Sequence, residues 1–256
     1  MRKAAVFLVW GKQVYIADIL RKVKASSDLL RGCDIYILTD LILADECVLN
    51  AGLTVFIKTV AFTLPHLLRK TEILNFLPEG YDAYLYLDAD TLVVGDITLG
   101  FEAAATHGIA IAAAPHYSLD AFCDFGRIMA LEGLALHGQL QFNTGVIFFN
   151  PLLDHVQTVF SRWNKLAIKY KLSYLPNDQP FFTLACLLTE FNCFNLSPSY
   201  NYRGTGDCIS GIIRIWHSHY DPPADLNQYP NIFRRRVFKG DHSVNYTHRL
   251  CKYPQQ

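Results

Sequence analysis

The sequence predicts an α/β fold in which helices flank a mainly parallel, doubly wound sheet. Near the amino end, apolar strand-like runs enclose a segment whose apolar residues recur at helical spacing, an order that makes neighbouring strands parallel. Midway along the chain, an apolar run leads directly into two acids, as at the end of a buried strand. With 256 residues, 51% of them hydrophobic, we expect one large domain over residues 1–228 and a tail over 229–256.

The first half of the chain contains the predicted parallel unit. Residues 4–9 predict a strand, 14–24 a helix and 34–40 a second strand, followed by a strand over 54–60 and a helix over 65–76. The buried strand then covers residues 84–87, and an apolar run resumes over 91–94. In such sheets ligands bind at the carboxyl ends of the strands, so residues 9–11, 39–40 and 88–90 are expected around one crevice.

The second half is predicted to complete the sheet and cover it. Residues 103–114 predict a helix, a turn at His107-Gly108 and a strand, whereas 116–137 fit either a surface excursion or a lid. A strand over 145–149 precedes an amphipathic helix over 154–171 and a second helix over 180–189. A late strand over 212–216 places His217 at its end.

The charge balance, the lengths of the apolar runs and the cysteine spacing exclude several classes of protein. Lys plus Arg and Asp plus Glu each total 23, so the basic excess typical of a nucleic-acid binder is missing, and we expect no nucleic-acid partner. No apolar run reaches about 18 residues, so the sequence predicts no membrane-spanning helix. The seven cysteines are scattered without Cys-x-x-Cys spacing, which argues against a disulfide framework and a zinc site and predicts a cytoplasmic protein.

Asp88 and Asp90 are the strongest candidates for a metal site. Residues two apart in an extended chain point the same way, so both carboxylates address one point, as divalent cations with a preference for oxygen ligands require. Two adjacent anions are also unfavourable unless a cation lies between them. The alternative is a pair of solvated turn acids, and the triplet alone does not decide between the two.

Four motifs, in the following order along the chain, indicate a function more specifically than the Asp88-Ala89-Asp90 triplet does alone. The chain reads LYLDADTLVVGDI over 85–97, FNTGVIFFN over 142–150, PNDQP over 176–180 and IWH over 215–217. Together they resemble glycosyltransferase family 8, the glycogenin and bacterial lipooligosaccharide galactosyltransferase type. The resemblance covers most of residues 6–219 and implies a GT-A fold with a mixed, mainly parallel sheet, and the transfer of a sugar from a UDP-sugar.

The resemblance also implies roles for the motif residues. Asp88, Asp90 and His217 are expected to hold Mn²⁺ or Mg²⁺, which stabilises the negative charge that builds on the departing diphosphate. Asp178 and Gln179 are expected at the reacting sugar, where a carboxamide is a poor nucleophile and retention by a front-face displacement is favoured. The remaining expected donor contacts in the motifs are Ala89, Asn143 and Thr144. For Asn143 a structural turn role is the alternative.

The nucleotide is expected at the ends of the first two strands. By resemblance, Val9, Trp10, Tyr15 and Asp40 hold the base and ribose, while ordinary core aromatics and a helix cap are the alternative for these positions. Arg69 and Lys70 fall where the family carries a basic residue that faces the donor phosphate. Because they are adjacent on a helix, only one is expected to face inward and the other to be solvated.

The chain departs from the family after His217. Relatives carry a Gly-x-x-Lys-Pro-Trp-like segment whose lysine touches the diphosphate, whereas here the sequence continues Ser-His-Tyr-Asp-Pro-Pro. The lysine is missing. His219 or Arg203 is expected to supply the compensating positive charge.

We therefore predict a metal-dependent glycosyltransferase that acts on a saccharide, glycolipid or protein acceptor. Two alternatives stay open at this point: a glycoside hydrolase that uses paired carboxylates without a metal, and a non-catalytic protein that binds sugar nucleotides. The tail over 229–256 is rich in arginine and aromatic residues. It predicts a reversible contact with a membrane surface or an acidic glycolipid.

Overall fold

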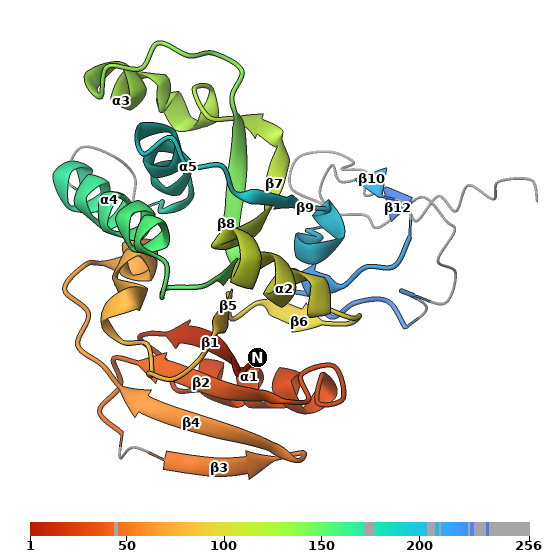
Figure 1. Cartoon of the computed structure of the whole chain (residues 1–256). Coiled ribbons are helices and arrows are strands. Elements are labelled where there is room, and N and C mark those ends of the chain that lie inside the picture. Colours follow the sequence, from red (N-terminus) through yellow and green to blue (C-terminus); the bar gives the residue numbers. More distant parts are fainter. Residues whose placement is uncertain are drawn as a thin grey trace, which may run out of the picture.

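The computed structural model describes residues 1–43, 46–171, 177–203, 208–209, 211–224, 226–227 and 234–235. Within these ranges eight strands form one mixed sheet in the order β3-β4-β2-β1-β5-β8-β7-β9 (Figure 1). Their bounds are β1 Lys3–Val9, β2 Cys33–Thr39, β3 Glu46–Asn50, β4 Leu53–Thr59, β5 Ala83–Leu87, β7 Ile109–Ser118, β8 Leu140–Phe149 and β9 Phe194–Leu196.

The sheet is parallel from β4 to β5 and antiparallel at β3 and from β5 to β7, and its outermost pair at the other edge is parallel again. Strands β4, β2, β1 and β5 pair in parallel, as do β7 and β9, whereas β3, β5 and β7 each have an antiparallel neighbour. The predicted α/β class with a mixed, mainly parallel sheet is confirmed. Strand β5 is buried at all five residues, which explains its unbroken apolar run.

Strand β3 is an edge strand that the sequence analysis did not predict. It joins β4 through Ala51 and Gly52, both of which have positive φ, as in the tight turns that match the twist of a hairpin. Only one face of such an edge strand packs against the protein. Its sequence Glu-Cys-Val-Leu-Asn therefore lacks the apolar run that identifies the central strands.

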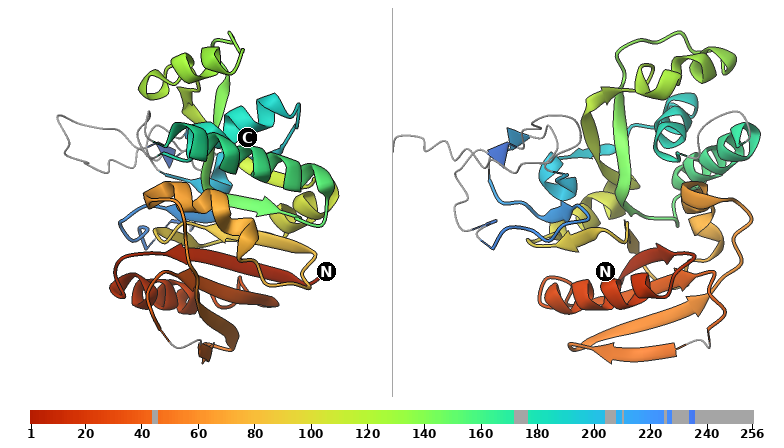
Figure 2. Two further views of the ribbon diagram at one scale, coloured as in Figure 1. Left: turned by 90° about the vertical axis from the view of Figure 1, so that its left-hand side faces the viewer. Right: turned by 180° about the vertical axis from the view of Figure 1, so that it is seen from behind.

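Helices cover both faces of the sheet. Helices α1 (Val14–Ala25) and α2 (Thr98–His107), with the 3₁₀ turn η3 (Pro198–Asn201), contribute to the core on one face. On the other face, α4 (Asp154–Tyr170) and α5 (Gln179–Leu188) pack against the sheet, and Figure 2 shows α4 lying across it. The predicted excursion after β7 contains η2 (Phe122–Asp124) and α3 (Gly126–Leu131).

The segment predicted as a helix over 65–76 is a 3₁₀ helix, η1 (His66–Asn75). Its four consecutive residues 70–73 are all buried, a pattern that a one-sided amphipathic α-helix does not produce. The Glu72 carboxylate accepts hydrogen bonds from the backbone of Thr63 and Leu64 and so ties η1 to the preceding loop. This local geometry turns Lys70 towards the sheet.

Two short strands beside the main sheet position the late histidine. Strand β6 (Thr91–Val93) pairs antiparallel with β11 (Ile215–His217), and His217 stands opposite Thr91. The pairing therefore carries a residue from the end of the chain to the acids that follow β5. Another short pair, β10 (Cys208–Ile209) with β12 (Arg234–Arg235), includes the only part of the predicted tail that lies within the described residues.

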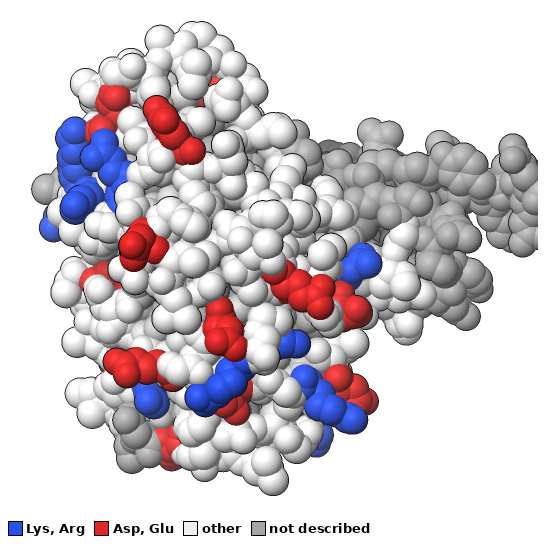
Figure 3. Space-filling model, viewed as in Figure 1, with Lys and Arg blue, Asp and Glu red and all other residues white. Residues whose placement is uncertain are grey.

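Surface charge is mixed rather than uniformly basic. On the face shown in Figure 3, acidic and basic side chains form separate groups on a surface made mostly of other residues, and basic ones gather at the edge near α4. After Asp154, α4 carries Arg162, Lys165 and Lys169 and no acid. Among the described residues, no helix combines the length and apolar character needed to cross a bilayer.

Candidate active site

A cavity of about 650 Å³ opens at the carboxyl ends of β1 and β5. It gathers residues from both ends of the chain, as the strand order predicts. The lining comprises Leu8, Val9, Trp10, Tyr15, Asp18, Lys22, Leu67, Lys70, Asp88, Ala89, Asp90, Asn143, Thr144, Gly145, Asn177, Asp178, Gln179, Arg203, His217 and His219. Of the predicted site residues, only Asp40 and Arg69 are missing from this lining.

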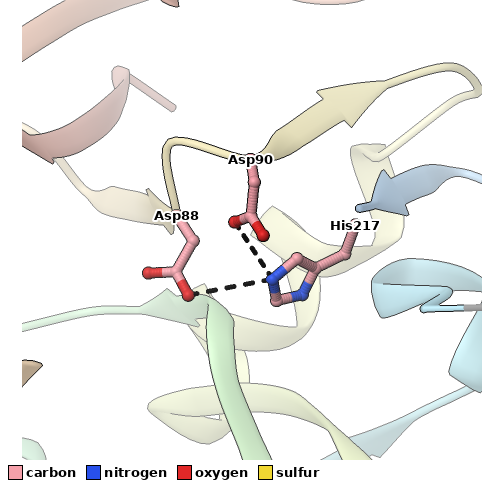
Figure 4. A group of neighbouring side chains, drawn as sticks. All are labelled: Asp88, Asp90 and His217. Atoms are coloured by element: carbon pink, nitrogen blue, oxygen red, sulfur yellow. Dashed lines mark ion pairs between the residues drawn. The ribbon is translucent and has the colours of Figure 1, made fainter. Parts of the chain in front are cut away.

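Asp88, Asp90 and His217 converge at one wall of the cavity (Figure 4). The Nε2 atom of His217 lies 3.2 Å from a carboxylate oxygen of Asp90 and 3.8 Å from one of Asp88. One ligand atom from each residue lies within 4.8 Å of the other two. Two carboxylates and an imidazole suit Mn²⁺ or Mg²⁺, so the residues present fit the divalent cation that the family resemblance implies.

Gly145 in β8 leaves the space that this cluster occupies. A Cβ at this position would overlap the Cε1 atom of His217 and stand 2.9 Å from a carboxylate oxygen of Asp88. The backbone carbonyl of Gly145 also accepts the hydrogen bond of the Asp88 amide. The FNTG motif therefore lines the cavity with Asn143 and Thr144 and leaves room for the cluster at Gly145.

Replacing Gly145 with alanine is expected to displace His217, because the added methyl group and the imidazole cannot occupy the same space. We expect Mn²⁺ affinity, measured by electron paramagnetic resonance, to fall about tenfold or more, with secondary structure unchanged by circular dichroism. Ser161→Ala, at an exposed position of α4 outside the cavity lining, is the control. Unchanged Mn²⁺ affinity in Gly145→Ala would contradict this account of the cluster.

Asn201 in η3 orients the imidazole of His217. The Asn201 amide nitrogen donates to the backbone carbonyl of Asn143 at 3.2 Å, which leaves its carbonyl oxygen facing His217 Nδ1 at 2.7 Å. That oxygen can only accept, so Nδ1 carries the hydrogen and Nε2 faces the two carboxylates. Burial raises the pKa of Asp90, but hydrogen bonding and attraction to His217 outweigh it and hold that pKa well below its usual range.

A buried charge cluster lies beside these three residues. Lys70 is 4% exposed, and its Nζ atom contacts both carboxylate oxygens of Asp88, at 2.8 and 2.9 Å, and one of Asp178 at 3.6 Å. Burial lowers the pKa of Lys70, yet attraction to Asp178 and Asp88 reverses the shift, so the ammonium stays charged. Tyr86 donates to Asp88 at 2.5 Å and completes its surroundings.

Asp178 occupies the floor of the cavity at the start of α5. Thr144 donates a 2.6 Å hydrogen bond to its carboxylate, and the Trp163 indole of α4 donates to its backbone carbonyl. Burial raises the pKa of Asp178, and the nearby Lys70 opposes the shift without cancelling it. Two predicted motifs, FNTG and PNDQP, thus meet through Thr144 and Asp178.

Some of the residues predicted to hold the nucleotide line the cavity, and the others form an ion pair outside this lining. Val9, Trp10 and Tyr15 line the cavity. Asp40 instead accepts the Gly11 amide and pairs with Arg69 at 2.7 Å, and the Arg69 guanidinium lies 5.6 Å from the centre of the Trp10 ring. Arg69 is therefore ion-paired and partly buried rather than solvated, while Lys70 is the member of the pair that faces inward.

Several lining residues escaped the sequence analysis, among them Asp18, Lys22 and Gly145, and so did Asn201 behind His217. Asp18 and Lys22 are four apart on α1, a spacing that usually marks a solvated helix pair. Of the two residues predicted to compensate for the missing lysine, His219 is 87% exposed at its side chain and lies 3.5 Å from Asp90. Arg203 also lines the cavity.

Comparisons with known proteins identify a family and a shared fold. The family model described as "Glycosyl transferase family 8" matches residues 54–229. A galactosyltransferase LgtC structure in complex with donor and acceptor sugar analogues shares the fold, with a TM-score of 0.57 and 14% identity over 87% of this chain and 90% of that one. A comparison with curated protein sequences finds no significant match.

Two further structures share the fold. The glycosyltransferase GlyE of Streptococcus pneumoniae TIGR4 has a TM-score of 0.53 and 21% identity over 80% of this chain. The match covers 47% of the GlyE chain, so this chain corresponds to about half of it. Mouse xyloside xylosyltransferase 1 has a TM-score of 0.55 and 16% identity over 86% of this chain and 99% of that one.

Proposed function

The chain belongs to glycosyl transferase family 8, and we propose that its donor is a nucleotide diphosphate sugar, namely a UDP-sugar. Its activity is that of a glycosyltransferase. The observation that supports this donor is the shared cavity, in which Asp88, Asp90 and His217 lie beside Asp178 and Gln179. The acceptor is expected to be a saccharide, a glycolipid or a protein, which enters the same cavity.

Within this proposal, Asp88, Asp90 and His217 would hold the divalent cation, Mn²⁺ or Mg²⁺. When bound, the cation supplies charge stabilisation to the departing diphosphate. The protein's own contribution is preorganisation: Asn201 fixes the ring of His217, and Lys70 and Tyr86 fix the carboxylate of Asp88. These partners are already in place, so little reorganisation is needed when the donor binds.

Asp178, Gln179 and Asn143 are proposed to bind the transferred sugar. All three line the cavity and are mostly buried, so hydrogen bonds to sugar hydroxyls would form with little competition from water. Gln179 has no carboxylate with which to form a covalent intermediate. Retention through a front-face displacement, in which the acceptor enters on the side that the diphosphate leaves, is therefore the proposed stereochemical course.

Replacing Asp178 with asparagine is expected to lower turnover more than nucleotide binding, because the side chain faces the sugar rather than the base. Asparagine can still accept the Thr144 hydrogen bond, so the fold should be kept. The measurement is the rate of UDP release from UDP-glucose and UDP-galactose, beside UDP affinity. Asp28→Asn, at an exposed position, is the control. An unchanged rate and an unchanged ratio between the two donors would refute the role.

The experiment that tests the proposed function is a UDP-release screen across nucleotide sugars with Mn²⁺, with and without candidate acceptors. We expect release from at least one UDP-sugar that stops in EDTA. Metal-independent cleavage of a glycoside would favour the hydrolase alternative, which the family assignment does not support. Nucleotide binding without turnover of any donor would favour a non-catalytic protein.

The predicted tail over 229–256 lies outside the described residues apart from residues 234–235. Its arginine and aromatic residues support the proposal that it meets an anionic membrane surface or an acidic glycolipid, at about 1 kcal/mol for each basic residue near the surface. Deleting residues 229–256 should abolish co-sedimentation with phosphatidylserine vesicles. Unchanged co-sedimentation would remove this proposal. The cytoplasmic location, predicted from cysteine usage, likewise stays a prediction.

A further inference from the structure

We propose that Lys22 binds the diphosphate of the donor and replaces the lysine that relatives carry after the metal-binding histidine. The inference rests on the proposed function, because it assumes a donor that contains a diphosphate. Lys22 belongs to α1, close to the start of the chain, whereas the missing lysine would follow His217. The two positions nevertheless lie near each other in the fold, since Lys22 lines one pocket with His219 and Pro222 of the segment that follows His217.

The Lys22 ammonium lies against the segment expected to hold the metal. Its Nζ atom donates a 2.5 Å hydrogen bond to the backbone carbonyl of Ala89 and pairs with Asp18 at 2.8 Å. Ala89 stands between Asp88 and Asp90 in the sequence, so Lys22 is bonded to the segment that carries both proposed metal ligands. An anion attracted to a cation at those carboxylates would be attracted to Lys22 as well.

The burial of Lys22 distinguishes it from an ordinary helix-surface lysine. Its side chain is only 11% exposed, whereas Lys24 on the same helix is exposed to solvent and does not line the cavity. An ammonium shielded from water in this way interacts more strongly with a phosphate than one that water and salt screen. Lys22 also keeps its apolar stem packed, so the ammonium is held in one place before the donor arrives.

The other cations of the cavity are less suited to this role. Lys70 contacts both oxygens of Asp88 and one of Asp178, so its positive charge is balanced by these two carboxylates. His219 is 87% exposed at its side chain, where water screens its interaction with an anion. Arg203 also lines the cavity, whereas Lys22 both lines it and donates a hydrogen bond to the backbone carbonyl of Ala89.

The test compares the affinities of UDP and uridine in the presence of Mn²⁺, since uridine has the base and ribose but no phosphate. In Lys22→Met the dissociation constant of UDP should rise about 10- to 100-fold, the usual range for the loss of one hydrogen bond to a charged group, while that of uridine changes by less than about twofold. Lys22→Arg should retain most of the UDP affinity. Lys24→Met, the matched control on the same helix, should change neither.

A purely structural role makes a different prediction. If Lys22 only ties α1 to Ala89, Lys22→Met should weaken the binding of uridine and of UDP by the same factor, or lower the melting temperature. In either case the ratio of the two dissociation constants would not change. Asp18→Asn provides a second readout, because it removes a negative charge beside Lys22 and should raise the preference for UDP over uridine. An unchanged UDP-to-uridine ratio in Lys22→Met would overturn the assignment. Wild-type protein that binds neither compound would instead overturn the proposed donor.

Discussion

Replacing Asp90 with asparagine is expected to lower turnover of the UDP-sugar by about 100-fold or more while leaving the folded protein intact. The substitution removes one of the two anionic ligands proposed for the metal, and the charge stabilisation at stake is several kcal/mol, which corresponds to two or more powers of ten in rate. Asp90 is partly exposed at the end of the motif, so asparagine is accommodated without a cavity or steric overlap. The measurements are the steady-state rate with Mn²⁺ and the melting temperature without metal.

The same experiment separates catalysis from folding. We expect the melting temperature of metal-free Asp90→Asn to stay within a few degrees of the wild type, because asparagine has the same size, keeps an oxygen that can accept from His217, and replaces a partly exposed side chain. Asp28→Asn, in an exposed ion pair remote from the cavity lining, should change neither quantity. Wild-type turnover in Asp90→Asn would contradict the proposed ligand set.

Replacing Lys70 with methionine is expected to have the largest effect on stability. The substitution leaves Asp88 and Asp178 without the ammonium that contacts them both, and loss of one member of a buried ionic cluster costs about 3–5 kcal/mol. For a chain of this length that loss corresponds to roughly 10 °C in the melting temperature. Thermal unfolding, followed by circular dichroism in EDTA, gives the measurement.

Metal provides an internal check on this prediction. A divalent cation at Asp88 offsets part of the charge that Lys70 no longer balances, so Mn²⁺ should raise the melting temperature of Lys70→Met more than that of the wild type. Lys24→Met, which removes an exposed lysine, should behave as the wild type in both conditions. A Lys70→Met protein as stable as the wild type in EDTA would contradict the buried charge cluster.

The sequence predicted those parts of the fold and site that local pattern determines. The apolar run of β5 followed by Asp88 and Asp90, the strand that ends at His217, and the polar loop before α5 are each visible in a short window. Three such windows carry the proposed metal ligands and Asp178. The rule that ligands bind at the carboxyl ends of strands predicted a crevice at residues 9–11 and 88–90, whereas Asp178 and His217 were assigned to it through the family resemblance.

The parts that escaped prediction depend on tertiary contacts. Strand β3 is an exposed edge with no apolar run, and η1 buries four consecutive residues that have no helical periodicity. Asn201 gains its place behind His217 only because η3 and β11 pack together, and Lys22 resembles half of a solvated i,i+4 pair until α1 is placed against Ala89. No short stretch of sequence contains both partners of either contact.

The central claim is that transfer depends on a cation held by Asp88, Asp90 and His217. The most direct measurement is UDP release from the preferred UDP-sugar in excess EDTA, followed by titration with Mn²⁺. We predict that activity disappears in EDTA and returns as Mn²⁺ exceeds the chelator. Full turnover in excess EDTA would contradict the claim.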